Sequence, residues 1–322
     1  MRLFRKIALI CAAFSLTSCV KKKEITDAKL EYPFQVTTTV GMIADVARQI
    51  GGDLTTVKNI IGEGIDPHSF QAGMSDIEQL ASAELIFYNG LHLEGKLGST
   101  LEKQSKDKPV IALAEGLFEK DYEIIGGAEE SDPHVWMDVQ GWTQVASMIT
   151  SELEEFDPDN DGYYEKHYSE YLKSLIALQN YASHSFATIP ENQRVLVTAH
   201  DAFSYLGRAY GIKVMGIQGI STESKAGLKD INRLVTYLVE NKIPAVFIES
   251  SVPKESVTAL IEGAAARSHQ VVIGGELFSD AMGPDGTYEG TYIGMMDHNV
   301  TTITRALGGQ APEKGMHGKL SH

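Results

Sequence analysis

Cysteine is almost absent from this sequence, which has only Cys11 and Cys19 among its 322 residues. Cys11 lies in a segment that we expect to be removed on export, so the mature chain would keep Cys19 alone. A single cysteine forms no intramolecular disulfide and no thiolate metal site. The mature protein is therefore predicted to contain neither, although an exported protein meets conditions in which disulfides persist.

Long apolar runs and positive charge are scarce too. No run reaches the roughly 18 residues of a transmembrane helix, which excludes a polytopic membrane protein. Only 28 lysines and arginines face 43 aspartates and glutamates, which leaves a net charge of −15. Neutralising phosphates requires clustered basic residues, so a nucleic-acid binder is disfavoured. An acidic surface mildly concentrates cations, although solubility alone accounts for most of it.

What the sequence does contain is typical of a globular protein. Hydrophobic residues make up 43% of the chain, which is enough for sizeable cores. Charged residues at 22% with 8% aromatics argue against a disordered chain. At roughly 150 residues per domain, the length predicts about two domains.

The first 18 residues are typical of an export signal. A basic start precedes the apolar stretch Ile7–Leu16, which is too short to span a bilayer. Leu16–Cys19 then resembles a bacterial lipobox, in which a peptidase cuts before the cysteine and lipid is attached to it. We expect a signal peptide at 1–18, lipid on Cys19 and a polar tether over 19–33; the alternative is an ordinary secretory signal. Cleavage would remove three basic residues and no acids, and so take the net charge from −15 to −18.

From residue 34 onward, short β-branched runs alternate with helical patterns. This alternation predicts parallel sheets flanked by helices. The expected strands are 34–40, 56–61, 85–88, 110–113, 194–199, 213–217, 245–248 and 271–273. The expected helices are 42–50, 75–83 (with Ser75 as N-cap and Glu78 completing a capping box), 145–156, 202–210, 225–241, 253–267 and 295–307.

Residues 162–187 interrupt this alternation with a long pattern of apolar and aromatic residues that lacks proline and internal glycine. About 25 helical residues span roughly 38 Å at 1.5 Å each. We predict an α/β fold of two lobes, at 34–160 and 190–322, joined by one long helix at 161–189. The alternative is a helix of ordinary length followed by a loop.

The histidines are the residues of this sequence that are most informative about function. The tripeptide Asp-Pro-His occurs twice, ending at His68 and at His134, and proline stiffens each of these loops. His200 ends the expected strand 194–199, and His68 also follows a strand. In open α/β sheets, ligands bind outside such carboxyl ends. Asp280, which follows the strand 271–273, is a candidate oxygen ligand.

Three neutral imidazoles and one carboxylate suit Zn²⁺ or Mn²⁺. The residues alone leave ordinary alternatives open, because a histidine after a strand is more often a turn or cap residue than a ligand. Asp280 could be a helix N-cap, and His92 could be a spare ligand. The remaining histidines are expected to be solvated or structural.

A wider pattern is carried by six segments: Asp66–Phe70, Asp132–Trp136, Thr198–Phe203, Gly216–Thr222, Phe247–Ser251 and Gly274–Gly283. Together they resemble the metal-binding lipoproteins of ABC importers for zinc and manganese, the TroA-like (ZnuA/PsaA) group, and within it the TroA type. The resemblance extends over nearly the whole mature chain. It implies two α/β lobes joined by one long helix, with a metal buried between them and bound by His68, His134, His200 and Asp280.

Two departures bear on the metal. Zinc-specific relatives often carry a long His-rich acidic loop before the second ligand, whereas 119–131 is acidic here without histidine. Manganese-selective relatives commonly have glutamate at the position of His200. The Irving–Williams order makes Zn²⁺ bind a given N/O site more tightly than Mn²⁺. We therefore expect tighter binding of zinc in vitro and a physiological cargo of zinc or manganese.

The resemblance implies a high-affinity extracytoplasmic solute-binding protein that delivers one Zn²⁺ or Mn²⁺ per chain to an ABC transporter permease. We expect a monomer, not an enzyme, anchored through its lipid in the periplasm or at the cell surface, without a nucleic-acid partner. The alternatives are a zinc-dependent surface hydrolase, with Glu249 as the best candidate general base, and a metal-stabilised adhesin lipoprotein. Glu249 could instead be a partner behind a metal ligand or a surface contact. Four side-chain ligands favour the carrier, because a catalytic zinc keeps a position open for water.

Overall fold

The computed structural model describes residues 30–126 and 131–321. The predicted signal peptide at 1–18 and Cys19 lie outside these ranges. Tyr32–His322 form one compact unit, so the division into lobes at 34–160 and 190–322 stays a prediction. Within the described part of the chain, no helix is both long and apolar enough to cross a membrane.

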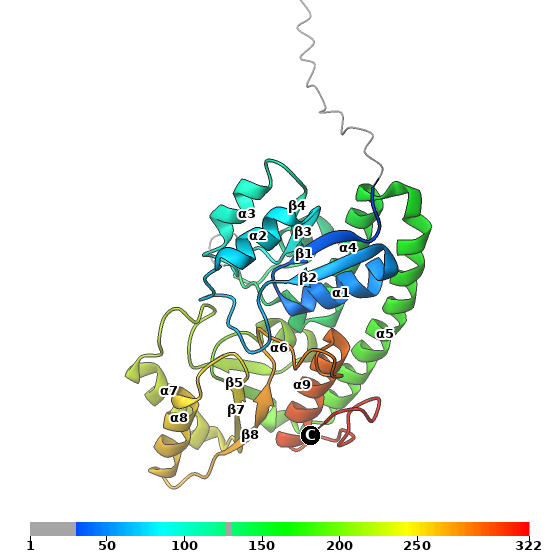
Figure 1. Ribbon diagram of the computed structural model, residues 1–322. Coiled ribbons are helices and arrows are strands. Elements are labelled where there is room, and N and C mark those ends of the chain that lie inside the picture. Colours follow the sequence, from blue (N-terminus) through cyan, green and yellow to red (C-terminus); the bar gives the residue numbers. More distant parts are fainter. Residues whose placement is uncertain (1–29, 127–130, 322) are drawn as a thin grey trace, which may run out of the picture. The chain divides into compact units, whose positions relative to one another are not determined.

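The N-terminal half is built on one parallel sheet of four strands, coloured blue to cyan in Figure 1. The strands are β1 (Phe34–Thr38), β2 (Thr55–Asn59), β3 (Leu85–Tyr88) and β4 (Val110–Ala112). Their order in the sheet is β2-β1-β3-β4. The central strand β1 pairs with both neighbours, with Phe34 opposite Thr55 and Val36 opposite Leu85. These β-branched and aromatic runs lie where the sequence predicts strands.

Four α-helices accompany this sheet: α1 (Gly41–Gly51), α2 (Met74–Ser82), α3 (Gly98–Gln104) and α4 (Val139–Phe156). The chain moves one way across the sheet from β1 to β2 and the other way from β2 to β3. Because crossovers are right-handed, α1 and α2 lie on opposite faces. Accordingly, α1 contacts α4, whereas α2 contacts α3.

The predicted connecting helix is present as one continuous helix, α5 (Asp161–Ala187), of 27 residues. At 1.5 Å per residue it spans about 40 Å. It packs against α1 and α4 of the N-terminal half, and against the C-terminal helices α6 (Ser204–Tyr210) and α9 (Tyr292–Ala306) (Figure 1). Its length lets one rigid element brace both halves of the compact unit.

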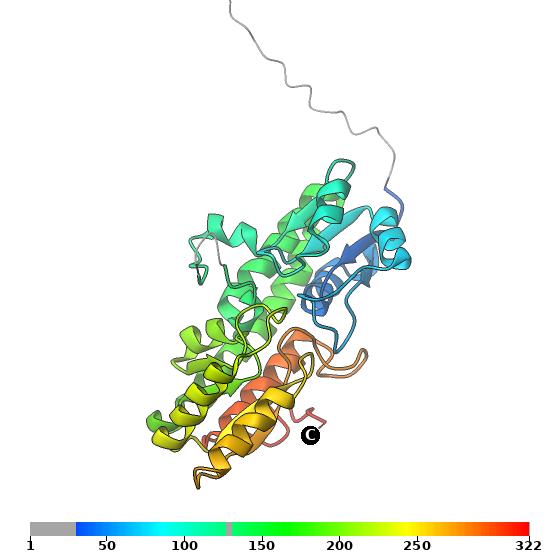
Figure 2. The same cartoon turned by 90° about the vertical axis from the view of Figure 1, so that its left-hand side faces the viewer.

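The C-terminal half contains two short parallel sheets, of which one pairs β5 (Val195–Thr198) with β6 (Lys213–Gly216) and the other β7 (Ala245–Glu249) with β8 (Val272–Leu277). β5 also contacts β7, so the carboxyl ends of strands from both sheets meet. Helices α7 (Leu228–Asn241) and α8 (Glu255–Ala265) pack against each other, as Figure 2 shows. The prediction of parallel sheets flanked by helices is therefore confirmed in both halves.

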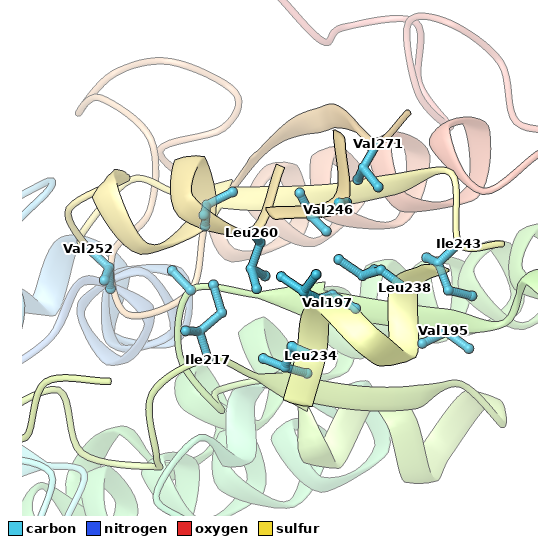
Figure 3. Close-up of a cluster of buried hydrophobic side chains, with 14 residues drawn as sticks. Val195, Val197, Ile217, Leu234, Leu238, Ile243, Val246, Val252, Leu260 and Val271 are labelled. Carbon is cyan, nitrogen blue, oxygen red and sulfur yellow. The ribbon is translucent and has the colours of Figure 1, made fainter. Parts of the chain in front are cut away.

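A hydrophobic core holds α7 and α8 against these strands (Figure 3). Val197 of β5 and Val246 of β7 meet Leu234 and Leu238 of α7 and Leu260 of α8, and all five side chains are completely buried. Burying a side chain of this size stabilises the fold by roughly 1.5–3 kcal/mol. The core therefore fixes the ends of β5 and β7, which carry the polar residues described below.

Several helix starts differ from the sequence prediction: α7 begins at Leu228 instead of 225, α9 begins at Tyr292 instead of 295, and α2 and α4 also differ. The predicted N-cap Ser75 lies inside α2, because Gly73 is the N-cap and its backbone N–H donates to Asp76 Oδ2 at 2.8 Å. α4 begins at Val139, six residues before the predicted start, with Asp138 capping Gln140 N at 3.0 Å. Glycine at 141 is atypical of a helix, so the sequence pattern does not indicate this first turn. In the structure the Tyr122 ring packs where a Cβ atom would stand. Helix α3 was not predicted.

Candidate metal centre

The two Asp-Pro-His tripeptides adopt the same local geometry. His68 lies between β2 and α2, and its backbone N–H donates to Asp66 Oδ1 at 2.9 Å. His134 precedes the short 3₁₀ helix η3 (Val135–Met137), and its backbone N–H donates to Asp132 Oδ1 at 3.0 Å. In both, the aspartate side chain closes a turn around proline, which is the behaviour that favours Asp in turns. The repeated tripeptide thus fixes the position of the histidine that follows the proline.

His200 and Asp280 come from the carboxyl ends of the C-terminal strands. His200 follows β5, and its backbone N–H donates to Glu249 Oε1, at the end of β7, at 2.9 Å. Its ring Nδ1 lies 2.5 Å from Glu249 Oε2. Asp280 follows β8, and the neighbouring Ser279 carbonyl accepts a hydrogen bond from Trp136 Nε1 at 2.8 Å. This last contact ties the aspartate segment to the loop that carries His134.

The fold brings these four side chains together. One ligand atom from each of His68, His134, His200 and Asp280 lies within 4.8 Å of the others. His68 Nε2 is 3.2 Å from His134 Nε2. Asp280 Oδ1 is 3.2 Å from His134 Nε2, and Asp280 Oδ2 is 3.2 Å from His200 Nε2. His134 and His200 therefore turn Nε2 toward the carboxylate, and His68 turns its Nε2 toward that of His134.

These separations match the size of a small divalent ion. Bonds of about 2.0–2.1 Å in tetrahedral geometry place donor atoms about 3.3–3.4 Å apart. Both oxygens of Asp280 are buried, and neither receives a hydrogen bond of good geometry from any described residue. A buried carboxylate without such donors is costly unless a cation lies beside it. The arrangement can therefore hold one metal ion through three nitrogens and a carboxylate.

Carboxylates also fix two of the rings from behind. Asp132 Oδ1 lies 2.7 Å from His134 Nδ1, and Glu249 holds His200 in the same way. Such partners fix the tautomer and orientation of a metal-binding histidine, so that Nε2 faces the metal. The backbone of Asp132 is itself anchored, because Tyr205 donates its hydroxyl to the Asp132 carbonyl at 2.8 Å. In the sequence, Asp132 stands out only as part of the repeated tripeptide, and nothing there indicates that its side chain lies behind His134.

Burial and nearby charges give the three imidazole rings different pKa values. Burial lowers the pKa of His68 to about 4. Burial also opposes charge on His134, but Asp132 and Asp280 outweigh it and raise the pKa to about 9. Against the same effect of burial, Glu249 and Asp280 raise the pKa of His200 well above its ordinary value. The imidazolium groups in turn hold the pKa of Asp280 well below its usual range, although burial opposes this. At pH 7 the cluster thus carries two ring protons that an incoming divalent ion can replace without changing the local charge.

The other described histidines lie outside the four-residue cluster, and His167, expected to be solvated, is half-buried. His167 Nδ1 faces the Ile50 carbonyl at 3.2 Å, His269 Nε2 faces the Ile243 carbonyl at 2.8 Å, and His298 Nε2 faces the Glu276 carbonyl at 2.9 Å. His92 lines a separate surface cavity with Glu115, so it is not part of the four-residue cluster.

The fold and the buried cluster define a class: a metal-binding α/β protein braced by one long helix. Residues 36–306 match the family described as "Zinc-uptake complex component A periplasmic". The manganese-binding lipoprotein MntA of Bacillus subtilis (strain 168) is 43% identical over 93% of this chain and 97% of its own length. The zinc-binding protein TroA of Treponema pallidum (strain Nichols) is 42% identical over 94% and 98% of the two chains.

The solved structure of periplasmic zinc-binding protein TroA from Treponema pallidum superposes with a TM-score of 0.82 at 44% identity, and the match covers 85% of this chain and 98% of that one. The chain belongs to the ZnuA/TroA family of metal-binding substrate-binding proteins. The predicted family is therefore confirmed. Members of this family are transport proteins and not enzymes, so the hydrolase and adhesin alternatives are not favoured.

Proposed function

We propose that the protein captures Zn²⁺ or Mn²⁺ outside the cytoplasm and delivers it to the permease of an ABC transporter. The observation that carries this proposal is the convergence of His68, His134, His200 and Asp280 within 4.8 Å, all buried. A closed set of four side chains suits a carrier, because hydrolysis requires an open position for water. The relatives named for manganese and for zinc support both cargoes.

Three imidazole nitrogens and one carboxylate should bind Zn²⁺ more tightly than Mn²⁺. Imidazole nitrogen with one carboxylate suits Zn²⁺, and the Irving–Williams order places Mn²⁺ far below it at the same N/O site. Asp280 can also offer both of its oxygens, since each faces one histidine at 3.2 Å. A fifth donor atom would serve Mn²⁺, which accepts more oxygen ligands. The cargo in the cell is therefore a matter of metal supply as well as affinity.

The lipid on Cys19 belongs to the same proposal. The lipobox at Leu16–Cys19 would place the folded unit outside the cytoplasm, anchored to a membrane through the tether over 19–33. Two or more acyl chains give a stable anchor, whereas one is marginal. We expect the carrier to act as a monomer in the periplasm or at the cell surface, close to the permease that it supplies.

Elemental analysis tests the carrier proposal directly. Protein purified without chelator is expected to contain one equivalent of zinc or manganese per chain, and dialysis against a strong chelator should remove it reversibly. The same samples should show no metal-dependent hydrolysis of ester, peptide or phosphate substrates. A protein that takes up neither metal, or that turns over such a substrate, contradicts the proposal.

Metal binding is expected to weaken steeply with acid. Because the pKa of His134 is about 9 and that of His200 is well above its ordinary value, both rings hold protons at pH 7 that the metal must displace. Affinity should therefore fall by up to about a hundredfold per pH unit from pH 8 to pH 6. Competition with a chromophoric chelator measures this, and calorimetry in two buffers counts the released protons. An affinity that does not change over this range would exclude the ligand set.

A further inference from the structure

Solvent reaches the four candidate ligands unequally. His134 and His200 are completely buried and Asp280 is 2% exposed, whereas His68 is 6% exposed. His68 is also carried by the irregular stretch 60–73, while His200 follows directly on the buried strand β5. The His68 loop, residues 60–73, is therefore the side from which an ion can enter or leave with least disturbance of the core.

Among the described residues, two hydrogen bonds tie the His68 loop to the C-terminal half of the fold, and the half-buried one reaches Asp66. Thr222, in the irregular stretch 217–227 between β6 and α7, donates its hydroxyl to Asp66 Oδ2 at 2.6 Å. The other oxygen of the same carboxylate accepts the backbone N–H of His68 at 2.9 Å. Asp66 thus links the backbone of a candidate ligand to the C-terminal half, across 156 residues of sequence.

A surface cavity opens beside this bond. Its volume is about 770 Å³, and Asp66 and Thr222 both line it. Two other contacts join the halves at exposed positions: Glu63 of the His68 loop accepts from Asp285 N at 3.2 Å, and Lys96 Nζ lies 3.3 Å from Glu223 Oε1 beside the loop. Exposed ion pairs and exposed hydrogen bonds contribute little, whereas a hydroxyl bonded to a half-buried carboxylate is worth more. The Thr222–Asp66 bond is therefore the stronger restraint on His68.

We propose that the Asp66–Thr222 hydrogen bond is the latch that keeps the His68 loop closed and sets the rate at which the bound ion leaves. Breaking it frees the loop to move into the adjacent cavity and leaves the ion with three protein ligands. This inference rests on the proposed metal-carrier function. Thr222 acts as a positioning residue, because it acts on the ion only through Asp66 and His68.

The latch is tested by Thr222→Val, which keeps the shape and removes the donor, and by Thr222→Ser, which keeps the donor. The zinc-loaded protein is mixed with excess chelator in a stopped-flow instrument, and the dissociation rate is recorded. Thr222→Val is expected to release zinc about tenfold faster, with a much smaller change in association rate. Thr222→Ser should release it at the wild-type rate. Thr222→Ala serves as a second variant and should match the valine.

Two matched controls separate the latch from a general effect. Ser69 donates to the same Asp66 Oδ2 at 2.9 Å but belongs to the His68 loop, so Ser69→Ala keeps the link between the halves and should accelerate release far less. Thr258→Val makes the same chemical change at an exposed site on α8, where the hydroxyl bonds the Lys254 carbonyl, and should leave release unchanged.

The outcomes distinguish the two proposals. Wild-type protein that binds neither metal refutes the carrier function. Wild-type protein that binds zinc while both Thr222→Val and Thr222→Ala release it at the wild-type rate refutes the latch alone. Equal acceleration by Ser69→Ala and Thr222→Val also refutes the latch, because local support of the loop would then suffice. Failure of Thr222→Ser to restore the wild-type rate has the same consequence.

Discussion

Replacing His200 by alanine is expected to abolish tight metal binding and to destabilise the empty protein as well. The first effect follows from losing a donor, which exceeds the roughly 10–100-fold cost of losing a partner behind a ligand. The second follows from Glu249, which is 4% exposed and lies against the ring of His200. Removing one member of a buried pair costs about 3–5 kcal/mol, because the other charge is left uncompensated. Calorimetry and chemical denaturation of the metal-free protein measure the two effects separately.

A second substitution separates affinity from stability. The variant His200→Ala/Glu249→Gln removes the Glu249 charge that His200→Ala leaves unpaired, so it should recover stability while metal affinity stays low. His68→Ala should lower affinity by at least tenfold with little change in the stability of the metal-free fold, because no carboxylate of the described residues pairs with its ring from behind as Asp132 and Glu249 do for His134 and His200. His184→Ala, on the exposed side of α5, is the control and should bind metal normally. Normal affinity in His200→Ala would remove His200 from the ligand set.

Much of the fold follows from local pattern. The strands 34–38 and 85–88 and the long helix 161–187 lie close to where the sequence predicts them, because their periods are uninterrupted and their apolar residues are buried. Errors fall at helix starts and at the end of one strand, because β8 runs to Leu277 and not to the predicted 273. At α2 a glycine takes the cap position, and at α4 a tertiary contact from Tyr122 makes glycine suitable inside a helix. Neither a backbone cap nor a distant ring is visible in local sequence.

The candidate site, like the fold, could be predicted only in part from the sequence. The four ligand types could be predicted, and so could the places of His68, His200 and Asp280 after strands, since strand ends of parallel sheets share one edge. Of the residues that hold them, Glu249 could be named only as one alternative, and Asp132 and Thr222 could not be assigned at all. The contact of Glu249 with His200 depends on β5 lying beside β7, and the contact of Thr222 with Asp66 depends on two irregular segments that meet across the site. Contacts of this kind are set by the packing of whole elements.

Asp280→Asn is expected to cause the second large loss of affinity, through charge rather than shape. The amide keeps the volume of the side chain but removes the negative charge that faces His134 and His200 at 3.2 Å. A metal with three neutral imidazoles then lacks its carboxylate ligand, and affinity should fall at least a hundredfold. In the metal-free protein the same change should lower the pKa values of both rings, because Asp280 is among the charges that raise them.

One experiment measures both the loss of metal affinity and the lowered pKa values of the two rings. Calorimetry at pH 7 in two buffers of different ionisation enthalpy should show about two protons released per metal in the wild type and fewer in Asp280→Asn. Asp285→Asn makes the same change of charge at an exposed position five residues away and should alter neither quantity. Wild-type affinity in Asp280→Asn would mean that the carboxylate neither binds the ion nor balances its charge, and the buried cluster would then need another explanation. An affinity loss without a change in proton count would instead place Asp280 on the metal while leaving the ring protons to Asp132 and Glu249.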